Sequence, residues 1–183
     1  MNLQQKASLA VIWNFFGMLA TKGTGIFTTL ILAIFLLPND YGLIAMITVF
    51  ILIGQTLANS GLNQAIVRLV NIDQEFLSTA HIAVLGFGLI VYALLWLIAP
   101  YIGYFYKTAI LEDLVRVSGV SIIINSFSSV RLSIYQRSLD FKTPLKAQFS
   151  ASIIGSAFAV CAAYLGLGVW SLVIQTIVSS IIS

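Results

Sequence analysis

The sequence has few of the residues on which metal sites and disulfide frameworks depend. Among its 183 residues there is one cysteine, Cys161, and one histidine, His81. Disulfides and thiolate metal sites within the chain are therefore excluded, and no cofactor is indicated. A single histidine without clustered partners also argues against an acid–base or metal-dependent enzyme. We expect Cys161 to be a small buried side chain and His81 to lie at a membrane interface.

Charge is also scarce. Only 8% of the residues are charged, with a net charge of +3, whereas a soluble domain carries about 25% charged residues. The acidic residues all lie between the apolar stretches: Asp40, Asp73, Glu75, Glu112, Asp113 and Asp140. Because proton- and sodium-coupled transporters use intramembrane Asp, Glu or His, no ion-coupling site is evident. No basic face with interleaved aromatic residues occurs outside the apolar stretches, which argues against nucleic acid as a partner.

Long apolar stretches make up most of the chain. It is 60% hydrophobic with a mean hydropathy of +1.03, and about 20 mostly apolar residues cross a bilayer as a helix. The expected spans are 9–37, 41–67, 78–105, 114–135, 145–165 and 169–183. We therefore predict an all-α membrane protein that forms a single six-helix lobe over residues 1–183. The first stretch is too long for a signal-peptide core, and the sixth is too short to cross a bilayer before Ser183, which predicts a truncated chain.

Lysine and arginine in short connections predict the orientation, because such residues stay on the cytoplasmic side. With a cytoplasmic N-terminus, the inner connections hold Lys6, Arg68, Arg137, Lys142 and Lys146. The outer connections then hold Lys107. This asymmetry predicts that the N-terminus is cytoplasmic and that six spans return the C-terminus to the same side.

Three of the expected spans carry a polar or small face at helical spacing. The first has Asn14, Thr21, Lys22, Gly25, Thr28 and Thr29. The second has Thr48, Gln55, Asn59 and Asn63, and the fourth has Ser118, Ser121, Asn125, Ser128 and Ser129. Two interpretations stay open. The faces either join packed helices by hydrogen bonds or line a hydrated cavity. The amides of Gln55, Asn59 and Asn125 are the candidates for a substrate pathway, because a buried amide needs several partners.

Lys22 is the one basic residue near the middle of an expected span. A charged side chain at that depth costs about 2.5–3.5 kcal/mol on insertion scales, so it indicates a functional site. We expect Lys22 to face a cavity and to attract a phosphate or another anion. Arg116 and Arg131 lie nearer the ends of their span, where we expect them to anchor the helix at lipid headgroups.

Small residues recur every four positions in the fifth expected span. The series is Ala147, Ala151, Gly155, Ala159 and Ala163. Small side chains at this spacing let another helix approach closely. We therefore predict that Ala151, Gly155 and Ala159 are helix-packing residues.

Several short motifs, taken in order, resemble the bacterial polysaccharide (O-antigen type) flippases. These form the polysaccharide transporter branch of the multidrug/oligosaccharidyl-lipid/polysaccharide exporter (MOP) superfamily. The matching segments are Leu37 to Met46 (LPNDYGLIAM), Asn59 to Leu62 (NSGL), Arg131 to Lys142 (RLSIYQRSLDFK), Gly166 to Ser171 (GLGVWS) and Trp13-Asn14-Phe15. The chain departs from many relatives at Gly17, Met18 and Ile34, where they carry charged residues.

The resemblance implies that the chain is the N-terminal part of a two-lobed transporter in the bacterial inner membrane. Such proteins move undecaprenyl-pyrophosphate-linked oligosaccharide to the outer leaflet for lipopolysaccharide, capsule or exopolysaccharide synthesis. The implied partners are membrane lipid, the lipid-linked oligosaccharide and either a second lobe or a second copy. The alternatives are a cation-coupled drug antiporter of the same superfamily, a membrane-embedded glycosyl enzyme, or a non-transporting remnant. The short outer connections argue against the enzyme.

Overall fold

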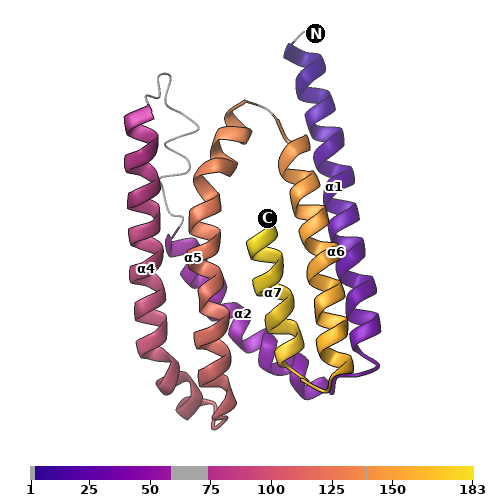
Figure 1. The fold of residues 1–183 in the computed structure, drawn as a ribbon, viewed down its shortest axis with the longest axis vertical. Coiled ribbons are helices and arrows are strands. Elements are labelled where there is room, and N and C mark those ends of the chain that lie inside the picture. The colour runs from indigo at the N-terminus through magenta and orange to yellow at the C-terminus, as the bar shows by residue number, and fades with distance from the viewer. Residues whose placement is uncertain (1–2, 59–73, 139) are drawn as a thin grey trace.

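The computed structural model describes residues 3–58, 74–138 and 140–183, where helices are joined by short turns. The described helices are α1 (Leu3–Leu32), α2 (Pro38–Ala58), α4 (Gln74–Phe105), α5 (Ile110–Arg137), α6 (Lys142–Tyr164) and α7 (Trp170–Ile182) (Figure 1). The predicted all-α class is confirmed.

Four helices are long and apolar enough to cross a membrane among the residues that the structure describes. They are α2, the Leu77–Phe105 part of α4, α5 and α6. Helix α1 has 30 residues, and α7 is apolar but has 13. Large apolar side chains such as Phe27 (70% exposed) and Ile34 (79% exposed) lie on the surface, as expected of a protein that faces lipid. The chain is a multi-pass membrane protein, while six spans and a cytoplasmic N-terminus stay predictions.

The boundary between the first two helices differs from the expected one. Helix α1 ends at Leu32 rather than at Leu37, and α2 begins at Pro38 rather than at Tyr41. Proline restricts the residue before it to extended conformations, yet it fits the first helical position because its missing N–H would be unpaired there. Asp40 stabilises the same turn by accepting a hydrogen bond from the Leu37 N–H at 3.0 Å. Pro38 therefore starts a helix and is not part of a separate turn.

The helices form two groups of three. Helices α2, α4 and α5 pack on one another, whereas α6 packs on α1 and on α7. Contact between α5 and α7 joins the two groups, and α5 and α6 touch only slightly. In Figure 1, α7 lies between α5 and α6 over part of their length, and α1 runs alongside α6. Helix α7 thus joins the two groups, and α5 and α6 stand apart where α7 does not run between them.

The largest apolar core joins α2, α4, α5 and α7. Its buried members include Leu43, Ile47, Ile51, Val91, Leu95, Ala99, Leu111, Leu114, Val115, Ile122, Val169 and Val173. A smaller cluster holds the end of α1 against α6 through Leu32, Leu36, Ala159 and Ala163. The apolar contacts thus keep α7 against the first group and α1 against α6.

The small residues of α6 lie at its contacts with other helices. Ala151 and Ala159 are 2% and 0% exposed, and Gly155 is buried. A Cβ atom at Gly155 would overlap the Ser179 Oγ of α7 and would lie 3.0 Å from the Gln175 carbonyl oxygen. The expectation for Cys161 was wrong. Its side chain is exposed, because it points away from the face that carries these small residues.

We predict that Gly155→Leu lowers the stability of the detergent-solubilised protein by about 1–3 kcal/mol, because overpacking forces helices apart. The thermal unfolding midpoint measures the effect. Gly86→Leu is the matched control, since a Cβ at Gly86 meets no atom within 4 Å. An equal midpoint for the two variants would contradict the close packing of α6 on α7.

Candidate functional site

Four hydroxyl groups join α1 to α6 and use part of the polar face of α1. Thr24 Oγ1 lies 2.7 Å from Ser152 Oγ, and Thr28 Oγ1 lies 2.7 Å from Ser156 Oγ. The pairs advance by four residues on each helix, so the two helices run parallel in register. We call these four residues the hydroxyl ladder. Thr24 and Thr28 are therefore helix-joining residues.

The serines of α5 are likewise used mainly inside the protein. Ser118, Ser121 and Ser129 are buried. Ser121 donates a hydrogen bond to the Ser118 carbonyl at 2.6 Å, and Ser129 donates one to the carbonyl of Ser126 at 2.8 Å. Hydroxyls bonded to their own helix need no partner from a cavity. Asn125 and Ser128, which belong to the same expected polar face, line a hollow instead.

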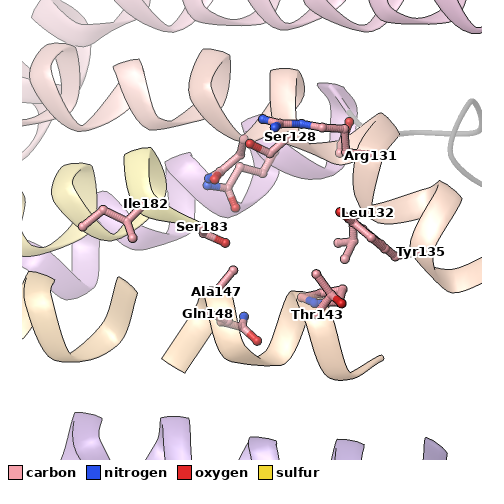
Figure 2. Close-up of a pocket in the computed structure, with 13 residues that line it drawn as sticks. Ser128, Arg131, Leu132, Tyr135, Thr143, Ala147, Gln148, Ile182 and Ser183 are labelled. Carbon is pink, nitrogen blue, oxygen red and sulfur yellow. The ribbon is translucent and has the colours of Figure 1, made fainter. Parts of the chain in front are cut away.

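A hollow of about 570 Å³ separates α5 from α6 where the two helices touch only slightly. Figure 2 shows Ser128 and Arg131 on one side of it and Thr143, Ala147 and Gln148 on the facing helix. The full lining is Gln55, Asn125, Ser128, Ser129, Arg131, Leu132, Tyr135, Thr143, Pro144, Ala147, Gln148, Ile182 and Ser183. Two amides that the sequence singles out, on α2 and α5, thus meet in one cavity.

Two further hollows share lining residues with this cavity or with each other. One of about 340 Å³ shares Asn125, Gln148 and Ser183 with it and is also lined by Thr21. Another, of about 510 Å³, shares Thr21 with the second and is lined by Thr21, Lys22, Gly25, Ile26, Thr29, Leu30 and Gln175. We call the three hollows together the polar groove.

The polar groove is cationic and rich in hydrogen-bonding groups. Lys22 lies at one end and Arg131 at the other, and both side chains are exposed. The Arg131 guanidinium carbon lies 5.2 Å from the centre of the Phe127 ring, a cation–π distance. No Asp or Glu side chain occurs among the described residues that line the groove. Such a surface attracts anions and offers amides and hydroxyls to neutral polar groups.

The charged residues Arg116 and Asp140 do not line the polar groove. Arg116 forms a 2.7 Å ion pair with Glu112, and its guanidinium carbon lies 4.3 Å from the centre of a Trp96 ring. Hydrogen bonds from the Thr143 side chain and backbone, with a smaller contribution from Lys142, hold the pKa of Asp140 below its ordinary value. Asp140 therefore stays ionised at neutral pH and orders the start of α6, from which Thr143 enters the groove.

The structure brings together most of the residues that the sequence marks as pathway candidates. Lys22, Gln55 and Asn125 line the polar groove, while Asn59 lies outside the described residues. Sequence reasoning missed Gln148 and Gln175, which line it as well. Each is an amide within an apolar stretch, the same signal that marks the other two amides. A search of the described chain for three or more clustered metal-ligating side chains finds none.

Comparison with known proteins places the chain among polysaccharide biosynthesis proteins. It is 24% identical over 170 residues to the succinoglycan biosynthesis transport protein ExoT of Rhizobium meliloti, an alignment that covers 93% of this chain and 34% of ExoT. It is 21% identical over 183 residues to the lipopolysaccharide biosynthesis protein WzxC of Escherichia coli, which covers 100% of this chain and 36% of WzxC. The chain thus spans about a third of the length of these relatives.

No solved structure matches the chain. The family model described as "Polysaccharide biosynthesis protein" matches residues 31–183, which is most of the chain. The family resemblance drawn from the sequence motifs is thereby confirmed. The chain belongs to the polysaccharide biosynthesis protein family.

Proposed function

We propose that this chain is a transmembrane lobe of a transporter that moves undecaprenyl-pyrophosphate-linked oligosaccharide across the bacterial inner membrane. The translocated oligosaccharide would serve lipopolysaccharide, capsule or exopolysaccharide synthesis. The observation that carries the proposal is the polar groove, which combines two cations, four amides and several hydroxyls without an Asp or Glu side chain in its described lining. The family and the names of the two relatives support it.

The chemistry of the groove fits the head group of such a lipid. A lipid tail stays in the bilayer while a pyrophosphate and its sugars cross, so the head group needs a polar and cationic route. Lys22 and Arg131 balance negative charge on the phosphates. Gln55, Asn125 and Gln148 offer donors and acceptors to sugar hydroxyls.

The arrangement of the helices supports the proposed orientation. The start of α1, the end of α5 and the start of α6 lie at one end of the molecule in Figure 1. Arg137, Lys142 and Lys146 belong to this end, as the charge asymmetry requires of the cytoplasmic side. A second lobe or a second copy would close the groove, which is open to the surface beside Lys22.

We predict that Gly25→Leu lowers surface polysaccharide in the native host while membrane abundance stays normal. A Cβ at Gly25 meets no atom within 4 Å, so a leucine fits the fold but fills the groove. Gly23→Leu is the matched control on α1, because Gly23 has equal space and does not line the groove. Equal polysaccharide from the two variants would show that this part of the groove carries no substrate.

We also predict that Lys22→Ala lowers surface polysaccharide without lowering membrane abundance, because the groove loses the cation beside Gly25. If charge is what matters, Lys22→Arg retains more transport than Lys22→Gln. Surface polysaccharide is quantified against the amount of tagged protein in the membrane. Normal polysaccharide from Lys22→Ala would rule out a role for this lysine in the pathway.

A further inference from the structure

Gln175 is the residue of α7 that lines the same hollow as Lys22. Six described residues of α1, Lys22 among them, and Gln175 from α7 line this hollow. The amide is therefore the contribution of α7 to the hollow that holds the cation. The sequence alone places it in an apolar stretch near the C-terminal end and links it to no polar face.

The Gln175 side chain can form more hydrogen bonds than it has within the described residues. Within the described residues its Nε2 has one hydrogen bond, to Ser156 Oγ at 3.5 Å. Hydrogen bonds from N–H groups are typically 2.7–3.2 Å long, so this one is weak. An amide can donate two hydrogen bonds and accept two, and an amide at membrane depth needs partners. The unused capacity lies beside the groove.

The hydroxyl ladder is complete without Gln175. Thr28 Oγ1 lies 2.8 Å from the Thr24 carbonyl oxygen and 2.7 Å from Ser156 Oγ. Because a hydroxyl has one proton, Thr28 either donates to the carbonyl and accepts from Ser156, or donates to Ser156. In both cases Ser156 has a lone pair left for the Gln175 N–H, and α1 stays joined to α6 if that bond is lost. The Gln175 amide is therefore not needed to hold α1 against α6.

We propose that Gln175 binds the sugar next to the pyrophosphate while Lys22 holds the pyrophosphate itself. This inference rests on the proposed function and adds a residue and its ligand chemistry. A sugar hydroxyl both donates and accepts, which matches an amide and does not match a cation. Helix α1 therefore contributes a charged contact to the pyrophosphate, and α7 contributes a neutral hydrogen-bonding contact to the sugar.

The experiment compares surface polysaccharide in the native host for three variants. Gln175→Leu is expected to lower it roughly tenfold at equal membrane abundance, the effect of an unmade hydrogen bond to a buried polar group. Gln175→Glu is expected to lower it at least as much, because a carboxylate beside Lys22 repels the pyrophosphate. Gln136→Leu is the matched control, since Gln136 is exposed at the end of α5 and does not line the groove. Polysaccharide at the control level from Gln175→Leu overturns the proposal.

A cross-link separates ligand binding from helix packing. In a Cys161→Ser background, the pair Ala151→Cys and Ser179→Cys reports the α6–α7 contact as disulfide yield, because the Ser179 hydroxyl donates to the Ala151 carbonyl at 3.2 Å. Adding Gln175→Leu is expected to leave the yield unchanged. A yield that falls together with the polysaccharide assigns Gln175 to packing and overturns the inference.

The Lys22 variants distinguish a failure of the Gln175 assignment from a failure of the proposed groove function. Low polysaccharide from Lys22→Ala with normal polysaccharide from Gln175→Leu removes only the assignment of Gln175. Normal polysaccharide from both variants removes the proposed groove function as well.

Discussion

A bilayer provides no hydrogen-bond partners, and the structure depends on this constraint. All the long described segments are helices, because a helix pairs the hydrogen-bonding groups of its own backbone. Short hydroxyl side chains follow the same rule. Thr48 donates to the Ile44 carbonyl at 2.7 Å, and Thr56 donates to the Leu52 carbonyl at 2.7 Å. Such threonines can lie on a lipid-facing helix without a neighbour.

The same constraint separates polar residues that join helices from those that line the groove. Hydrogen bonds between membrane helices contribute about 0.6 kcal/mol each, so the two rungs of the hydroxyl ladder set register more than they stabilise. Apolar packing, such as that of Leu32 and Leu36 on Ala159 and Ala163, holds α1 in place. Lysine and amide side chains are too long or too polar to be satisfied within their own helix. Lys22, Gln55, Asn125, Gln148 and Gln175 line the polar groove instead.

The position of the groove follows from how the helices pack. The close approach of α7 to α6 at Gly155 and its apolar contact with α5 place α7 between the two groups. Helices α5 and α6 touch only slightly, and a hollow of about 570 Å³ lies between them. The position of α7 also brings the Gln175 amide to the hollow that Lys22 lines. The electrostatic character of the groove therefore comes from residues on α1, α2, α5, α6 and α7 together.

The sequence by itself determined the class of the protein, its family and its cationic character, because composition, span length and the absence of acidic residues from the spans require no contacts. It also marked Lys22, Gln55 and Asn125 as polar groups without a local partner. Only the tertiary structure decided that Thr24 and Thr28 join helices while Thr21 and Thr29 line a groove. Residues on one helical face differ in this way because the neighbouring helix covers one edge of that face and leaves the other open. Helix pairing depends on side chains more than a hundred residues apart, such as Thr24 and Ser152, and no local pattern encodes it.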